Sequence, residues 1–387
     1  MRDVALVGAG QSPYGEHPDA GIKELFESAY DAMVESVDRR FDADDLDGAY
    51  VGSLGVGGYQ LGITGASLTS HLGLTGLPVQ RVENACASGG FALLDAVHAV
   101  GAGASEAVLA GGVEKMLDLS GDRSKYWLGV SGDTEYERLA GMTFAGVYAI
   151  AAQRYLHETD AEHEHLSKVA VKNHENGAVN PKAQFQREVS LEKAQGAPEI
   201  ADPLNLYDAC PTTDGAACAM VVPADEAHEY TDDPVYITGF GGGSDHLALH
   251  DRDTITSLSA VREAANDAYD RAGRTADDID FAEVHDCFTI AELLAYEDLG
   301  FADRGEGWRL IDEGRTRRDG DLPVNTSGGL KSKGHPLGAT GIGQVVEVFD
   351  QLRGDAGERQ VDGSVALSHN VGGSGGAATV FIYEVDA

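Results

Sequence analysis

The feature that most constrains how this 387-residue chain can fold is an internal duplication. The segment VALVGAG at 4–10 returns 231 residues later as VYITGFG at 235–241, and DDLDGAYV at 44–51 returns as DDIDFAEV at 277–284. A run of apolar residues with helical period separates the two segments in each half. Because a strand–helix–strand order requires crossover connections, the repeat predicts two similar α/β lobes of parallel strands, packed together.

The first half is longer than the second, which indicates an insertion. GAACAMVV at 215–222 matches GAATVFI at 376–382, and this offset of 161 residues is much shorter than that of the opening strands. We therefore predict an inserted segment of residues 115–204. The remaining chain is predicted to form an N-terminal lobe of residues 1–114 and 205–228 and a C-terminal lobe of residues 229–387.

Charge is distributed unevenly along the chain. Lys and Arg total 28 against 64 Asp and Glu, a net charge of −36, which argues against a nucleic-acid or anionic-membrane binder. So acidic a surface is typical of halophilic proteins, and we expect a salt-rich cell interior, with an acidic protein of a mesophile as the alternative. Residues 115–193, however, hold 10 basic and 12 acidic residues. This near-neutral stretch is predicted to dock an anionic ligand, with an ordinary surface lobe as the alternative.

Cysteine content and hydropathy predict a cytoplasmic protein. Four cysteines, none in a C-x-x-C pair, do not make a disulfide framework in a chain of this length. No run of 18 apolar residues could span a membrane, and the apolar stretch at the start is too short for a signal peptide. We therefore expect a reducing compartment and no membrane segment.

Cys86 is the strongest candidate for a nucleophile. It lies in VENACASGGF at 82–91, where an apolar strand passes through a turn of small residues into a helical pattern. The helix dipole and free N–H groups at a helix N-terminus favour the thiolate, so we expect a lowered pKa for this thiol. The small neighbours leave room for an acyl group; a buried inert cysteine is the alternative.

Three further segments can complete a site around Cys86. His335 lies in the glycine-rich stretch NTSGGLKSKGHPLGATG, where it is free to act as a base toward a thiol. His285 and Cys287 lie in EVHDCF, at the carboxyl end of a predicted strand, where catalytic groups gather in α/β sheets. In SHNVGGSGG at 368–376, glycines allow backbone N–H groups to approach a ligand closely.

Other motifs are interpreted as structural. GAGQSP at 8–13 lacks the third glycine of a dinucleotide-binding fingerprint and has a proline where a helix should start, which argues against NAD. Cys210 and Cys218 flank small residues on a buried strand and are predicted to be packing residues. Four histidines follow no zinc-ligand spacing, so we predict a solvated surface there and no metal site. They are His157, His163, His165 and His174.

Together these segments resemble the thiolase family over essentially the whole chain. The resemblance is carried by the Cys86 segment, by GHPLGATG at 334–341, by DGAA at 214–217 and by NVGG at 370–373. It implies two duplicated βαβαβαββ lobes packed together, with a loop domain inserted in the first. In thiolases that loop domain helps to hold coenzyme A, which agrees with the near-neutral stretch.

The chain differs from most thiolases at two motifs. Asn370 takes the place of the second catalytic cysteine of a Cys-x-Gly motif, and HDCF at 285–288 replaces Asn-Glu-Ala-Phe. This exchange resembles the sterol-carrier-protein type of thiolase and its archaeal relatives. The resemblance implies that Cys287 is the acid/base and that His285 binds the oxyanion in place of the asparagine.

The same resemblance implies roles for the other site residues. His335 activates Cys86 and shares the enolate oxygen with His285, and the backbone N–H groups of Cys86 and Gly372 bind the tetrahedral oxyanion. The implied reaction is the condensation of two acetyl-CoA molecules to acetoacetyl-CoA, or the reverse thiolysis of a 3-ketoacyl-CoA, through an acyl-cysteine. Coenzyme A thioesters are then substrates, and no further cofactor is expected.

Two other functions stay open at this point. A decarboxylating ketoacyl synthase has a similar fold but no use for a second thiol at Cys287. A non-catalytic thiolase-like subunit that binds acyl-CoA has no need of Cys86, Cys287 and His335 together. The resemblance also implies a homodimer or homotetramer and a small OB-fold accessory subunit. It leaves open the acyl chain length, the direction of the reaction and the pathway in lipid metabolism.

Overall fold

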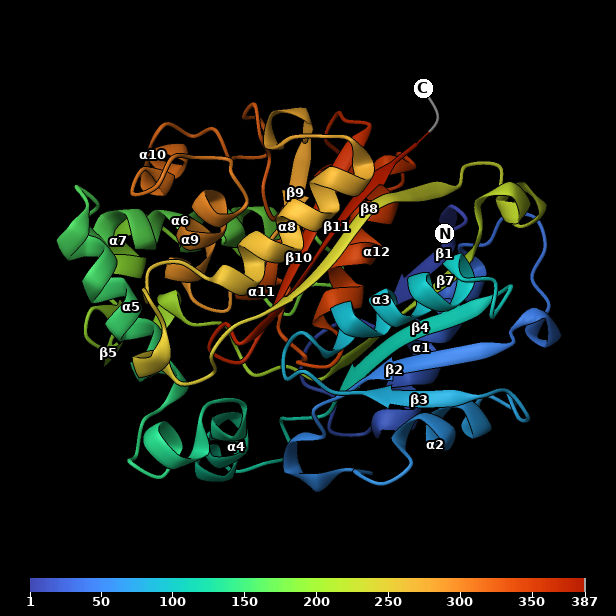
Figure 1. Ribbon diagram of the computed structural model, residues 1–387. Coiled ribbons are helices and arrows are strands. Elements are labelled where there is room, and N and C mark those ends of the chain that lie inside the picture. The colour runs from blue at the N-terminus through green and yellow to red at the C-terminus, as the bar shows by residue number, and fades with distance from the viewer. Residues whose placement is uncertain (386–387) are drawn as a thin grey trace.

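The duplicated strands of both halves join in one nine-stranded sheet in the computed structural model, which describes residues 1–385 (Figure 1). Its strands are β1 (Val4–Gln11), β2 (Gly48–Gly52), β3 (Val79–Val82), β4 (Val108–Glu114), β7 (Gly215–Pro223), β8 (Val235–Ser244), β9 (Phe281–Glu283), β10 (Val365–Gly372) and β11 (Ala377–Glu384). Their order across the sheet is β3-β2-β4-β7-β1-β8-β11-β10-β9. The first strands of the two halves, β1 and β8, are neighbours near the centre of the sheet. Outward from them, β7, β4 and β2 on one side correspond to β11, β10 and β9 on the other.

The strand directions confirm the duplicated α/β fold and refine it. β2 runs parallel to β3 and β4, and β9 runs parallel to β10, as crossover connections require. The last strand of each half differs, because β7 runs antiparallel to β1 and β4, and β11 runs antiparallel to β8 and β10. The expectation of parallel strands is therefore wrong for β7 and β11. β11 follows β10 directly, without a helix between them, whereas β7 follows β4 only after the inserted segment.

Helices cover both outer faces of the sheet and separate its two halves. They are α1 (Ile22–Glu35), α2 (Thr64–His71), α3 (Ser88–Gly101), α4 (Gly121–Leu128), α5 (Phe144–Glu158), α6 (His163–Gly177), α7 (Leu191–Gln195), α8 (Ser259–Ala272), α9 (Thr289–Asp298), α10 (Gly307–Asp312), α11 (Gly329–Ser332) and α12 (Thr340–Leu352). α3 and α12 lie between the two halves of the sheet, α1 covers the first half, and α8 covers the second (Figure 1). In residues 1–385 no helix combines the length and the apolar character needed to cross a bilayer.

The apolar side chains of each helix determine which face of the sheet it covers. Leu93 of α3 and Phe349 of α12 are buried between strands of both halves. Phe26 and Met33 of α1 pack on the other face of the first half, seven residues apart as one face of a helix requires. The site described below lies where the N-termini of the two central helices meet.

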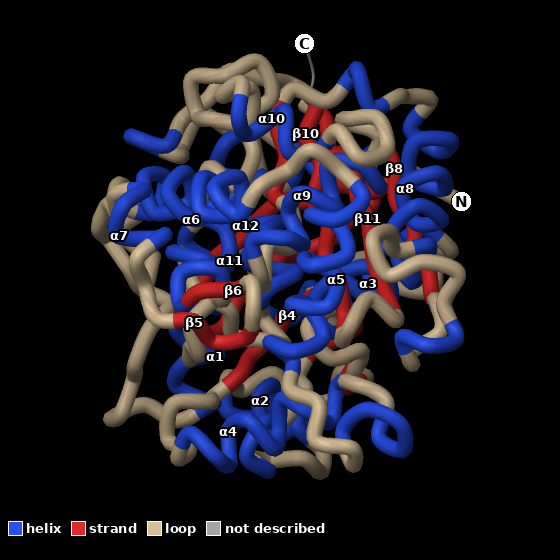
Figure 2. Tube along the Cα trace, turned by 90° about the vertical axis from the view of Figure 1, so that its left-hand side faces the viewer, coloured by secondary structure: helices blue, strands red, loops and turns tan. Residues whose placement is uncertain are grey.

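The inserted segment contacts both halves of the molecule. Its helices α5 and α6 pack on α9 of the second half, while α4 lies apart from them, beside the 56–58 turn of the first half (Figure 2). A short two-stranded sheet of β5 (Glu199–Ala201) and β6 (Leu204–Asn205) completes it. That residues 115–204 form a separate domain remains a prediction.

Candidate active site

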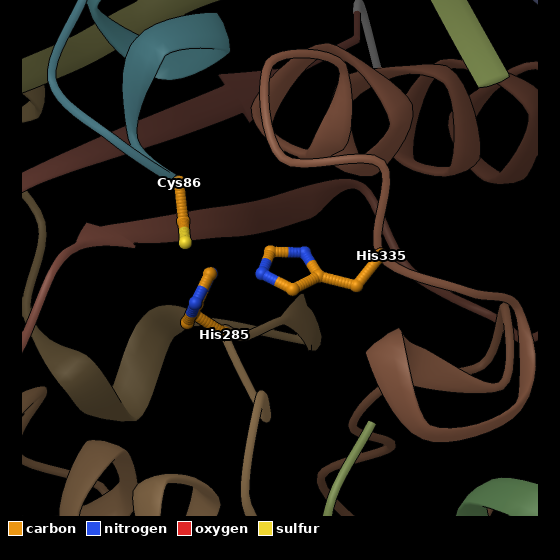
Figure 3. A group of neighbouring side chains, drawn as sticks. All are labelled: Cys86, His285 and His335. Carbon is orange, nitrogen blue, oxygen red and sulfur yellow. The ribbon is translucent and has the colours of Figure 1, made fainter. Parts of the chain in front are cut away.

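Three predicted site residues from distant parts of the chain converge in one buried site. One ligating atom each of Cys86, His285 and His335 lies within 4.8 Å of the other two, and the three side chains point toward one another (Figure 3). The two imidazole rings stand edge to face, with centroids 5.1 Å apart. All three side chains are buried, so the site excludes bulk water.

The backbone before α3 presents Cys86 to this site. The preceding Ala85 has a φ of +51°, which turns the chain sharply between β3 and the helix. The Ser88 hydroxyl holds the turn, because it accepts from the Asn84 N–H at 3.0 Å and donates to the Ala85 carbonyl at 2.6 Å. The turn places the thiol at the start of the helix, as the sequence predicts.

Glycines bring the His335 segment against the Cys86 helix. A Cβ atom added at Gly341, in α12, would lie 2.3 Å from the backbone nitrogen of Gly90, in α3. No real side chain tolerates such a contact, so the two helix N-termini can touch only because residue 341 lacks one. The last glycine of GHPLGATG is therefore explained by helix contact.

Hydrogen bonds leave His335 ready to accept a proton. Its Nδ1 lies 2.7 Å from the Thr340 hydroxyl, which donates its own proton to the Pro336 carbonyl at 3.0 Å. The hydroxyl can then only accept, so Nδ1 carries the proton and Nε2 keeps its lone pair. Nε2 is buried without a partner among the described residues, and it is the atom that can receive the Cys86 proton.

Hydrogen bonds leave His285 ready to donate a proton in a hydrogen bond, in contrast to His335. The Asn370 carboxamide accepts through Oδ1 from the Gly90 N–H at 3.3 Å, so its Nδ2 donates to Nδ1 of His285 at 3.1 Å. The proton of a neutral imidazole then sits on Nε2, where it can be donated to a substrate oxygen. Burial and the nearby His335 and His369 hold the pKa of His285 well below its usual range, which keeps it neutral.

The expected lowering of the Cys86 pKa is wrong for the resting site. Burial raises the pKa of this thiol, and this outweighs the lowering by the N–H groups of Gly373 and of Cys86 itself. Burial also lowers the pKa of His335 to about 3. The resting pair is therefore a neutral thiol and a neutral imidazole, and the proton has to move as the substrate is attacked.

This neutral pair predicts a distinctive pH dependence. A thiol whose pKa is raised has little thiolate at neutral pH, so alkylation of Cys86 by iodoacetamide should rise continuously from roughly pH 6 to pH 9. Mass spectrometry of the Cys86 peptide measures the rate. A rate that is already constant above about pH 6 would show a thiolate–imidazolium pair and contradict the prediction.

Cys287 and Cys86 line the same cavity, which has a volume of about 410 Å³. Phe144 and Ile200 of the inserted segment and Leu337 give its wall a mainly apolar character. A mainly apolar cavity of this size suits a small-molecule ligand, and both thiol residues lie on its wall. Burial, Cys210, Cys86 and Asp286 raise the pKa of the Cys287 thiol.

Several predictions are corrected here. Cys218 is a buried packing residue on β7, but Cys210 lies on a loop beside Cys287 and lines the cavity. The amide that faces the Cys86 thiol belongs to Gly373, where a φ of +61° turns the chain, and Gly372 remains a prediction for the oxyanion.

The prediction of a solvated histidine cluster is also wrong for two of its members. His165 and His174 are buried, because the ring of His165 packs 4.7 Å from that of Trp308 and that of His174 stacks on Phe185. Sequence reasoning further missed the roles of Asn370 and Thr340 toward the histidines. The small polar side chain in place of a family cysteine was the available signal for Asn370.

Comparisons with known proteins agree with this geometry. The sequence family "Thiolase, N-terminal domain" matches residues 4–225, and "Thiolase C-terminal domain-like" matches residues 241–385. The chain is 46% identical to "Acetyl-CoA acetyltransferase" of Methanothermobacter thermautotrophicus, over 99% of this chain and 100% of that protein. It is 34% identical to human "Sterol carrier protein 2", over 100% of this chain and 72% of that protein. A solved structure, "Ltp2-ChsH2(DUF35) aldolase", superposes with a TM-score of 0.85 at 25% identity, over 99% and 98% of the two chains.

Proposed function

Because the chain belongs to the thiolase family of acyltransferases, we propose that it condenses two acetyl-CoA molecules to acetoacetyl-CoA and runs the reverse thiolysis. The observation that carries this proposal is the convergence of Cys86, His335 and His285 beside a second thiol, Cys287, in one cavity. A nucleophile, a base, a hydrogen-bond donor and a second acid/base are the groups that such a Claisen condensation needs.

In the first half-reaction Cys86 is acylated. Nε2 of His335 takes the Cys86 proton as the sulfur attacks the thioester carbonyl of acetyl-CoA, and the tetrahedral oxyanion is held by backbone N–H groups. The N–H of Cys86 and an N–H from the Gly372–Gly373 turn supply these donors, each worth about 10² to 10³ in rate. The C–S bond to coenzyme A then breaks, and His335 returns the proton to the leaving thiolate.

In the second half-reaction a carbon–carbon bond forms. Cys287 first gives its thiol proton to Nε2 of His335, which lines the same cavity. The Cys287 thiolate then removes a proton from C2 of a second acetyl-CoA, and Nε2–H of His285 holds the enolate oxygen. His335 can donate to the same oxygen only while it carries a proton on Nε2. The carbanion attacks the acetyl group on Cys86, the Cys86 sulfur leaves as a thiolate, and it regains its proton from Cys287.

The test of this proposal is product formation from acetyl-CoA alone. A thiolase forms acetoacetyl-CoA without malonyl-CoA, whereas a decarboxylating ketoacyl synthase requires malonyl-CoA. Chromatography of the CoA esters after incubation with either substrate distinguishes the two. A protein that forms neither product nor an acyl group on Cys86 would be a non-catalytic subunit.

The inserted segment is proposed to bind the nucleotide end of coenzyme A. Basic side chains of this segment that already form ion pairs are less available to bind its phosphates. Ion pairs engage four of its basic residues, namely Lys115, Arg154, Lys168 and Lys172. Lys125 of α4 lies on the wall of the cavity and forms no ion pair within residues 1–385. It is therefore the cation best placed to meet a phosphate.

Lys125→Gln is expected to raise the KM for acetyl-CoA about 3- to 10-fold, as the loss of one exposed charge contact predicts. Turnover of an acetyl-pantetheine thioester, which lacks the nucleotide, should be unchanged. Lys168→Gln is the matched control, because its ammonium lies 2.6 Å from Asp312 and is already paired. Equal effects of Lys125→Gln on both substrates would place the nucleotide elsewhere.

We further propose a cytoplasmic homodimer or homotetramer that works with a small OB-fold subunit. The name of the solved structure that superposes well, "Ltp2-ChsH2(DUF35) aldolase", includes a DUF35 protein beside Ltp2, which supports such an accessory subunit. The net charge of −36 supports function at molar salt, where the Debye length falls to about 3 Å and carboxylate repulsion is screened. Coenzyme A thioesters are proposed as substrates, with no further cofactor.

A further inference from the structure

Tyr148 of the inserted segment reaches the second thiol of the site. Its side chain is 4% exposed, and its ring stacks on that of Phe288, with centroids 4.7 Å apart and an angle of 22° between the planes. Phe288 directly follows Cys287, and the tyrosine hydroxyl lies within hydrogen-bonding reach of the Cys287 sulfur. No sequence motif predicts this contact.

The Tyr148 hydroxyl has one proton and two acceptors within reach. It donates to the Gly373 carbonyl at 3.3 Å, which is a long and therefore weak hydrogen bond. A thiolate accepts a hydrogen bond more strongly than a neutral carbonyl does. When Cys287 loses its proton, the hydroxyl can rotate from the carbonyl to the sulfur without any movement of the ring.

The surroundings of Cys287 make such a donor necessary. Burial, Cys210, Cys86 and Asp286 all disfavour its thiolate, and among the groups around this sulfur the Tyr148 hydroxyl favours it by a direct hydrogen bond. The buried Lys331 side chain favours the Cys287 thiolate only by electrostatic attraction, without a hydrogen bond to the sulfur.

Tyr148 itself faces the two thiols and Arg252, whose guanidinium is bonded to the Ser374 carbonyl at 2.7 Å. Burial and both thiols raise the pKa of Tyr148 well above its usual value, which outweighs the lowering by Arg252. The hydroxyl therefore stays a donor at every working pH.

We propose that Tyr148 is a positioning residue that donates a hydrogen bond to the Cys287 thiolate while this thiolate removes the C2 proton of the second acetyl-CoA. In this step the C2–H bond breaks and the S–H bond of Cys287 forms. The tyrosine proton stays on its oxygen throughout and returns to the Gly373 carbonyl. The proposal rests on the proposed function, because it assigns a partner to the base of that reaction.

Tyr148→Phe tests the proposal, because it removes only the hydroxyl and keeps the stack on Phe288. In a Cys86→Ala background, alkylation of Cys287 by iodoacetamide, followed by mass spectrometry of its peptide, should shift to higher pH by about one unit. This is the shift expected for the loss of one hydrogen bond to a charged group. In the protein with Cys86 present, condensation should fall about 10- to 100-fold, and acetylation of Cys86 should change less than about 3-fold.

Tyr383→Phe is the matched control. Tyr383 is fully buried, and its hydroxyl pairs with that of Ser368 at 2.8 Å rather than with a thiol. Its loss should move neither the Cys287 alkylation profile nor the ratio of the two half-reactions.

An unchanged alkylation profile in Tyr148→Phe would overturn the proposal, and so would a shifted profile with unchanged condensation. If the wild-type protein forms no acetoacetyl-CoA, the proposed function fails and the catalytic role of Tyr148 falls with it. The alkylation profile would still show independently whether the hydroxyl stabilises the thiolate, so the two failures are distinguishable.

Discussion

Alanine at position 86 is expected to abolish acyl-enzyme formation and to lower condensation and thiolysis by at least about 10⁴-fold. The Cys86 sulfur is the atom that both half-reactions pass through. It lies within 4.8 Å of a ring nitrogen of His335, whose Nε2 has no partner among the described residues. Mass spectrometry after incubation with acetyl-CoA measures the result. The wild-type protein should gain one acetyl group on the Cys86 peptide, and Cys86→Ala should gain none.

The fold should survive this substitution. Cys86 is a small residue at a helix start between Ala85 and Ala87, so alanine loses one sulfur atom and leaves the turn intact. Thermal unfolding of the two proteins provides the control. An acetyl group that persists in Cys86→Ala, or that lies on Cys287 in the wild type, would overturn the assignment of the nucleophile.

Cys287→Ala is expected to separate the two half-reactions. Acylation of Cys86 needs His335 as the base and should continue, whereas carbon–carbon bond formation should fall by roughly 10² to 10⁴, the usual effect of a positioned acid/base. Single-turnover acetylation and steady-state condensation, measured on the same preparation, give the two rates.

Cys210→Ala is the matched control for this experiment. Cys210 lines the same cavity, and its backbone N–H donates to the Cys287 carbonyl at 2.9 Å, so its replacement perturbs the same surroundings without removing the acid/base. It should lower neither rate by more than about 3-fold, as expected for a residue with no part in proton transfer. Equal losses of both half-reactions in Cys287→Ala would mean that Cys287 is structural or that the two roles are shared differently.

Most of the fold could be predicted because the sequence contains an internal duplication, so that each pattern of strands and helices occurs twice. The repeated segments became β1 and β8, β2 and β9, and β7 and β11, with α1 and α8 after the opening strand of each half. Strand and helix periods are local properties, so a pattern of apolar residues reports them directly. The direction of β7 and β11 was missed because pairing depends on which strands become neighbours in space.

The residues of the candidate site could be predicted from the sequence, but their protonation states could not. Cys86, His285, Cys287 and His335 were each recognisable from their own short motif. The pKa of Cys86 was mispredicted because a helix start and burial act in opposite directions, and only burial in the folded chain decides which is larger.

The sequence by itself determined the duplication, the four reactive side chains and the glycines that allow α3 and α12 to meet, since these depend on residue type and local spacing. Tertiary structure alone decided how protons are distributed among those side chains. Thr340 sets the tautomer of His335, Asn370 sets that of His285, and Tyr148 reaches Cys287 from a segment 139 residues earlier in the chain. The physical reason is that hydrogen bonds and burial depend on distances of a few ångströms between segments that are remote in sequence, and only the folded chain brings these together.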